Sequence, residues 1–87
     1  MKAVKLIIEG NVTSVGFRYF IRENAVKLNI KGYVRNIQDK VESVLEGTNI
    51  DVDKMVELCK KGSKFASVTN INIKEIRPLY LNKFEIR

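Results

Sequence analysis

The sequence predicts an α+β fold of the split βαβ kind, in which an antiparallel sheet carries both helices on one face. One observation is periodicity. Segments whose apolar residues alternate with polar ones, as in strands, are separated by two segments whose apolar residues recur every three or four positions, as in helices. The other observation is order, which runs strand, helix, strand, strand, helix, strand, with a short strand at the end. Right-handed crossovers then restrict the topology to a few arrangements.

The first strand and the first helix follow from spacing. Apolar residues at positions 4, 6 and 8 alternate with their neighbours and predict a strand over Ala3–Glu9. Apolar residues at positions 17, 20, 21, 25 and 28 recur at helical spacing and predict a helix from about Gly16 to Leu28. We expect Phe17 and Phe20 to lie in the core rather than to contact a ligand.

A hairpin and a second helix are predicted next. Lys31–Ile37 and Val41–Glu46 are typical strands, and Gln38-Asp39-Lys40 is the turn between them. Asp51 or Asp53 can cap a helix whose apolar residues stand at positions 52, 55, 56 and 59, and the glycine at position 62 predicts its end.

The last third of the chain supplies two more strands. Val68–Ile76 alternates Ile71 and Ile73 with polar residues and ends before Pro78, and Leu81–Ile86 predicts a short closing strand.

Composition and charge limit the class of protein. The chain has 87 residues, 45% of them hydrophobic and 30% charged, which predicts one small globular domain spanning residues 1–87. No apolar run approaches the ~20 residues of a membrane span, and the N-terminal residues lack the features of a signal peptide. Cys59 is the only cysteine and there is no histidine, so we expect a reducing cytoplasm and no metal site. The formal charge of +6 favours anionic partners.

The segment from Gly10 to Arg18 is the first candidate site. It follows an apolar strand, contains a glycine at each side of a short loop, and places an arginine in the first turn of the predicted helix. The N–H groups at a helix N-terminus attract anions and disfavour cations, so an arginine there suits an anion bound between them. The pattern indicates a cradle for a phosphate-sized group, although a glycine-bounded turn with a solvated arginine has the same spacing.

The second candidate is Asn36, near the end of the strand predicted over Lys31–Ile37. A side-chain amide can orient a water molecule because it both donates and accepts hydrogen bonds. An asparagine beside a hairpin also fits ordinary turn chemistry. The residue by itself does not separate the two interpretations.

Together the two segments resemble the acylphosphatase family. Its first motif is G-x-V-Q-G-V-x-[FY]-R, and its second is G-[FYW]-V-x-N followed by a hairpin, a valine and a glycine. The residues that carry the resemblance are Gly10, Val12, Val15, Gly16, Phe17 and Arg18 for the first motif, Gly32, Tyr33, Val34, Asn36, Val41 and Gly47 for the second, and the closing Phe84-Glu85-Ile86-Arg87. The resemblance therefore runs nearly from end to end.

The resemblance implies a ferredoxin-like sandwich and an enzyme that hydrolyses acyl phosphates to a carboxylate and inorganic phosphate. It implies that Arg18 binds the phosphate and that Asn36 positions the attacking water. The phosphate-binding loop would consist of Val12, Thr13, Ser14, Val15, Gly16, Phe17 and Arg18. No cofactor or metal is implied. We expect a cytoplasmic monomer with no membrane or nucleic-acid partner.

This chain departs from the family pattern inside the loop. Asn11, Thr13 and Ser14 stand where the family usually has arginine, glutamine and glycine. A serine at position 14 costs about 1 kcal/mol if that residue needs a positive φ. The hairpin after Asn36 is also one residue shorter than usual. A relative that binds an anion without efficient turnover is therefore an alternative.

Two other classes of protein share the predicted topology. A nucleic-acid-binding module suits the positive charge, but RNA-recognition domains carry paired aromatic residues on central strands. Tyr33, Tyr80 and Phe84 form no such motif. A small-molecule sensing or oligomerisation domain is the third class, and stabilisation by an amino acid rather than by phosphate would favour it.

Overall fold

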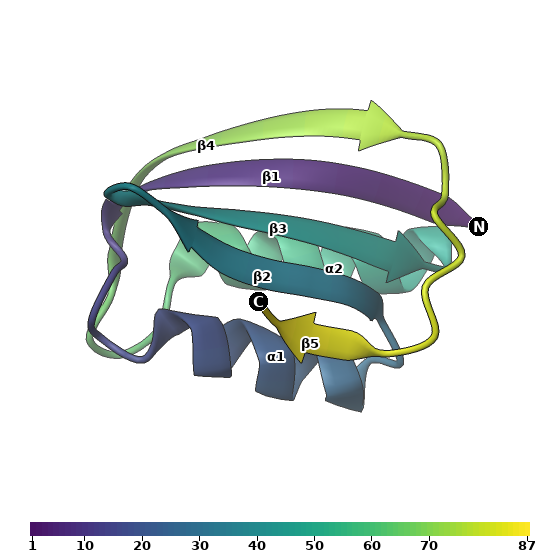
Figure 1. Ribbon diagram of the computed structural model, residues 1–87, viewed down its shortest axis with the longest axis horizontal. Coiled ribbons are helices and arrows are strands. Elements are labelled where there is room, and N and C mark those ends of the chain that lie inside the picture. Colours follow the sequence, from purple (N-terminus) through teal and green to yellow (C-terminus); the bar gives the residue numbers. More distant parts are fainter.

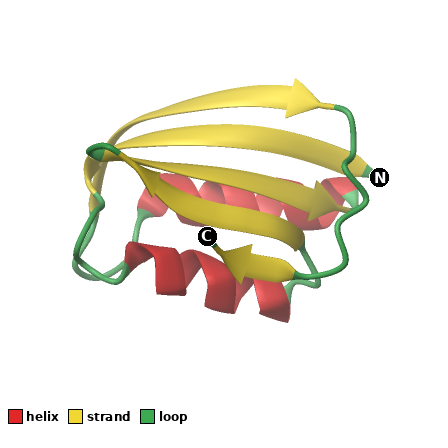
Figure 2. Ribbon diagram, viewed as in Figure 1, coloured by secondary structure: helices red, strands yellow, loops and turns green.

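A computed structural model describes residues 1–87. It consists of a five-stranded sheet with two helices on one of its faces (Figures 1 and 2). In chain order the elements are β1 (Lys2–Asn11), α1 (Phe17–Lys27), β2 (Lys31–Ile37), β3 (Lys40–Gly47), α2 (Asn49–Lys61), β4 (Ser67–Ile76) and β5 (Phe84–Ile86). The predicted α+β, ferredoxin-like class is confirmed. Neither helix is long and apolar enough to cross a membrane.

The strands lie in the order β4-β1-β3-β2-β5. The first four of these strands pair antiparallel, as predicted. The fifth does not, because β5 runs parallel to β2 and pairs with Gly32–Val34. The sheet is therefore mixed, and the expectation of a wholly antiparallel sheet is corrected at this edge.

The core lies between the sheet and the helices. Alternate residues of a strand share a face, so Val4, Leu6 and Ile8 of β1 point together toward the helices and are buried. Phe17 is buried at the start of α1 and stacks on the half-buried Phe20, with ring centroids 5.8 Å apart. Burial of each large apolar side chain contributes about 1.5–3 kcal/mol, and the prediction that these residues belong to the core is confirmed.

Cys59 lies on the buried face of α2. Burial raises the pKa of its thiol to about 12. A thiol with so high a pKa is not a nucleophile at neutral pH, so the prediction of a buried apolar residue is confirmed.

Two predicted boundaries are corrected at the hairpin end of the sheet. β1 continues past Glu9 through Gly10 and Asn11, because these residues pair with the start of β4 after a register shift. A Cβ atom at Gly10 would lie 2.1 Å from the Ser67 carbonyl oxygen, so this close approach requires glycine. The hairpin turn is also shorter than predicted, since Lys40 already belongs to β3 and pairs with Ile37.

Two more predictions are corrected at the opposite end. The cap of α2 is Thr48, whose Oγ1 accepts the Asp51 N–H at 3.2 Å, and not Asp51 or Asp53. β5 begins at Phe84 rather than at residue 81. The segment before it is held elsewhere, because the N–H groups of Leu79 and Leu81 donate to the Glu46 carboxylate.

Candidate active site

The loop between β1 and α1 lies at the same end of the sheet as the β2–β3 hairpin (Figure 1). Two buried residues, Val12 and Phe17, anchor the loop in the core. Ser14 and Gly16 between them are exposed. The backbone of the loop is therefore fixed at both ends and open to solvent in the middle.

Two loop residues adopt the left-handed backbone conformation. Ser14 has a φ of 60° and Gly16 has a φ of 76°. The strain expected at Ser14 is therefore present, and it costs a residue with a Cβ about 1 kcal/mol. Turns that include left-handed residues can point successive N–H groups into one concave anion site.

The N-terminus of α1 has no side-chain cap. Its N-cap residue is Gly16, which has no side chain that could accept a hydrogen bond from the helix, and the first turn contains no acidic residue. None of the turn, loop or cap hydrogen bonds is donated by an N–H group of residues 12–19. These groups and the positive end of the helix dipole remain available to an anion.

Arg18 stands in the first turn of α1 and is half-buried. It takes part in none of the ion pairs or side-chain hydrogen bonds of the structure. The planar guanidinium matches the oxygens of a phosphate and has no competing carboxylate.

Asn36 lies on the helix-covered face of β2. It pairs with Val41 of β3, which in turn pairs with Ile8 of β1, two residues before that strand reaches Gly10. The Asn36 side chain is exposed and appears in none of the side-chain hydrogen bonds. The structure thus brings Arg18 and Asn36 to one end and one face of the molecule, both without a partner.

A cluster of charged side chains on the opposite face of the sheet was missed by sequence reasoning. Its centre is Glu42, which is buried and contacts Arg35, Tyr33 and Lys5. Burial alone would raise the pKa of Glu42, but hydrogen bonds from Arg35 and Tyr33 and the charge of Lys5 outweigh it and lower the pKa. The pKa of Tyr33 is raised by burial and then by its hydrogen bond to Glu42. The sequence signal that could have indicated this cluster is a pair of glutamates, Glu42 and Glu46, whose spacing of four places them on one face of β3.

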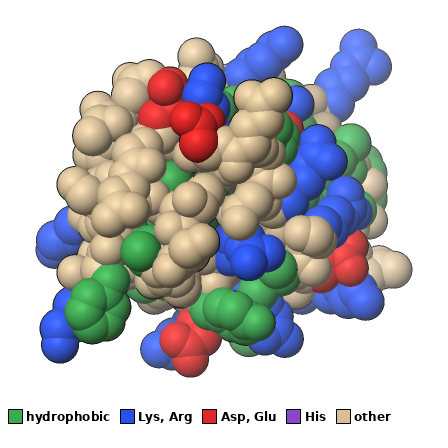
Figure 3. Space-filling view, turned by 60° about the vertical axis from the view of Figure 1, so that its left-hand side comes forward, with side chains coloured by type: hydrophobic (Ala, Val, Ile, Leu, Met, Phe, Trp, Pro, Cys, Tyr) green, Lys and Arg blue, Asp and Glu red, His purple; other side chains and the backbone are tan.

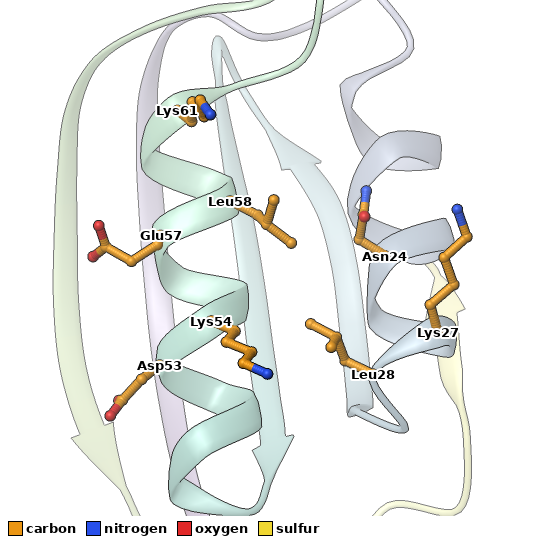
Figure 4. A pocket seen from close by; sticks show the side chains of 8 residues that line it. All are labelled: Asn24, Lys27, Leu28, Asp53, Lys54, Glu57, Leu58 and Lys61. Atoms are coloured by element: carbon orange, nitrogen blue, oxygen red, sulfur yellow. The ribbon is translucent and has the colours of Figure 1, made fainter.

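The site is an open surface rather than a cavity. Figure 3, with the hairpin end turned forward, shows a largely uncharged surface with both basic and acidic side chains around it. A groove of about 620 Å³ lies between α1 and α2 (Figure 4), and its lining consists of Asn24, Lys27, Leu28, Asp53, Lys54, Glu57, Leu58 and Lys61. None of these is a candidate site residue. No group of three or more histidine, cysteine or acidic side chains is placed to hold a metal ion.

These features define the class of protein. The fold is an α+β sandwich, and the end of its sheet presents free N–H groups, an unpaired arginine and an unpaired asparagine. Such a combination is suited to bind a phosphate-sized anion and a water molecule beside it.

Comparison with known proteins identifies the family. The acylphosphatase family model matches residues 4–86. An acylphosphatase of Methanocella arvoryzae is 46% identical over 88 residues, which cover 100% of each chain. The crystal structure of acylphosphatase from Bacillus subtilis superimposes with a TM-score of 0.95 at 38% identity, covering 100% of this chain and 99% of that one. An acylphosphatase from Coxiella burnetii gives a TM-score of 0.94 at 29% identity, covering 99% and 92%.

The chain belongs to the acylphosphatase family. The predicted family, the fold and the assignment to an acylphosphatase, a hydrolase, are confirmed. Membership implies an acyl phosphate as substrate and inorganic phosphate as product.

Proposed function

We propose that the loop N–H groups and Arg18 bind the phosphoryl group of an acyl phosphate while Asn36 orients the attacking water. The observation that carries the proposal is the open N-terminus of α1, which stands beside an arginine without a carboxylate partner. Asn36 supports it, because its amide is free and on the same face.

The chemistry requires little beyond these groups. The water oxygen bonds to phosphorus, the bond from phosphorus to the acyl oxygen breaks, and the carboxylate leaves with the electron pair while the water protons pass to phosphate and solvent. A carboxylate is a good leaving group, so protonation by a general acid contributes little. Phosphoryl transfer is catalysed mainly by positioning and by stabilising charge on the equatorial oxygens, which suits fixed N–H groups and one guanidinium.

Steady-state hydrolysis of benzoyl phosphate without added metal tests the roles of Arg18 and Asn36. We expect Arg18→Ala and Asn36→Ala each to lower kcat/KM by at least about 10²-fold, the usual cost of removing one such donor. Arg22→Ala, an exposed cation on the same helix, is the matched control and should retain activity. Full activity in either site variant would contradict its role. Phosphate binding without turnover by the native chain would show the catalytically impaired relative instead.

We further propose that a single domain spanning residues 1–87 acts as a monomer in the cytoplasm, without cofactor. The buried, single Cys59 suits a reducing compartment. Sedimentation equilibrium should give a mass near 10.0 kDa, and a value of twice that would contradict the monomer.

A further inference from the structure

The strand segment that carries Asn36 has a neighbour on one side only. β5 pairs with β2 through Gly32–Val34, and the last contact on that side is the hydrogen bond from the Arg87 N–H to the Val34 carbonyl. Residues 35–37 pair with β3 alone. A slip of one residue in this pairing would turn the Asn36 side chain to the other face of the sheet, away from α1.

The hairpin turn holds this register poorly. Only Gln38 and Asp39 connect the strands, and Gln38 has a φ of 55°. Glycine or asparagine is favoured where a two-residue turn needs a positive φ, and glutamine in the left-handed region costs about 1 kcal/mol. The turn therefore contributes little to the pairing of residues 35–37, which depends on the ladder with β3 and on contacts between side chains.

The charged cluster on the opposite face supplies such contacts. Arg35 and Glu42 are direct partners across the two strands, and the Arg35 Nε lies 2.9 Å from the Glu42 Oε2. The Tyr33 hydroxyl donates to the same oxygen at 2.9 Å, and the Lys5 Nζ lies 3.4 Å from Oε1. The cluster thus ties together β1, β2 and β3, immediately next to Asn36 in the sequence.

The burial of Glu42 makes the cluster selective for one register. Only 3% of Glu42 is exposed. A buried carboxylate that loses its partners carries a large penalty, and its hydrogen bonds are stronger than those in water. A slipped strand would move Arg35 and Tyr33 away from Glu42, so the native pairing is strongly favoured.

We propose that Glu42, acting through Arg35, is a positioning residue that holds Asn36 on the helix-covered face beside the phosphate-binding loop. The proposal rests on the proposed function of Asn36. Glu42 itself touches no reacting atom, since it lies on the opposite face of the sheet.

A double-mutant cycle tests whether Glu42 acts through Asn36. We expect Glu42→Gln, which keeps the size of the side chain, to lower kcat for benzoyl phosphate by about 10-fold, since small misplacements of a catalytic group cost up to about 10²-fold. Inhibition by inorganic phosphate should be unchanged, because the loop and Arg18 bind it. The variant Glu42→Gln/Asn36→Ala should be no slower than Asn36→Ala, because the two residues act as a unit.

Glu46→Gln is the matched control, a buried glutamate on the same strand and face but at the other end. We expect its effect on kcat to be small and to multiply with that of Asn36→Ala. The proposal is overturned if Glu42→Gln leaves kcat unchanged, or if the effects of Glu42→Gln and Asn36→Ala on kcat multiply in the double variant. It is also overturned if Glu42→Gln weakens phosphate inhibition by the same factor as it lowers kcat. Arg35→Ala and Tyr33→Phe repeat the test if Glu42→Gln does not fold.

A register measurement separates this proposal from the proposed function. If the native chain shows no turnover, the proposed function fails, but NMR contacts between Asn36 and Val41 still report the pairing. Loss of these contacts in Glu42→Gln, or their appearance as two sets of signals from two registers, supports the positioning role. An unchanged pattern, with the Asn36 side-chain signals unmoved, overturns it.

Discussion

The N-termini of the two helices lie at opposite ends of the sheet and differ in whether their polar groups have partners within the chain. At the hairpin end, α1 begins at Gly16 with no cap, and the side chains of Arg18 and Asn36 have no partner. At the other end, α2 begins with a hydrogen bond to the Thr48 side chain and has Asp51 in its first turn.

The connection between β4 and β5 completes the second end. The Glu46 carboxylate, of which only 1% is exposed, accepts the N–H groups of Leu79 and Leu81. Every polar group named at this end is satisfied within the chain. The hairpin end leaves comparable groups free, which lowers stability there and keeps them available to a ligand.

The largest effect on stability is expected from Glu46→Ala, at the satisfied end. The change leaves two N–H groups without their carboxylate, and hydrogen bonds to a charged group contribute about 1.5–3 kcal/mol each. Urea denaturation should show a loss of about 3 kcal/mol, while kcat of the folded protein is unchanged. Glu57→Ala, an exposed glutamate paired only with Lys60, should have little effect. An equal loss in both variants would contradict the role of Glu46.

A smaller effect is expected from the loop backbone at the open end. A Cβ atom at Gly16 would meet nothing within 4 Å, so Gly16→Ala measures the cost of its positive φ alone, about 1 kcal/mol. Ser14→Gly should change stability in the opposite direction and by less, because glycine also makes the unfolded chain more flexible. Thermal unfolding of the two variants checks both signs, and a stabilised Gly16→Ala would show that the left-handed conformation is not maintained.

The smallest effect is the dependence of stability on pH through Glu42. Its pKa in the folded protein is lowered from 4.5, so its contribution is present above that value and is lost as the pH falls through the lowered pKa. Urea titrations from pH 3 to 7 should show that Glu42→Gln loses less stability on acidification than the native chain. An equal loss of stability in both proteins would contradict this expectation.

The activity itself should vary little between about pH 5 and 8, because the chain has no histidine. A sharp optimum of activity near neutrality would contradict this prediction.

Every helix and strand was predicted from the sequence, and for β1, α1 and α2 the reason is that apolar residues at regular spacing determine which face is buried. The ends of the elements depended on partners distant in the sequence. β1 is prolonged by its pairing with β4, and β5 is shortened because Glu46 binds the segment before it. Thr48 was missed as a cap because two aspartates follow it within five residues and compete as sequence signals.

The candidate site was predicted in part for a similar reason. Glycines and an arginine within one short segment indicated the loop, and the family resemblance favoured one of the two interpretations of Asn36. Which groups are free could not be predicted, because an unpaired side chain is defined by what folds around it. Glu42 shows the same limit, since its three partners come from β1 and β2 and meet only in the sheet.

The comparison of the two ends is tested most directly by following backbone and arginine N–H signals while inorganic phosphate is added to the isotope-labelled chain. We predict saturable shifts of the N–H groups of residues 12–18 and of the Arg18 side chain, with no shift at the capped N-terminus of α2, residues 48–51. Shifts of equal size at α2, or no shift in the loop, would contradict the assignment of the hairpin end as the phosphate site.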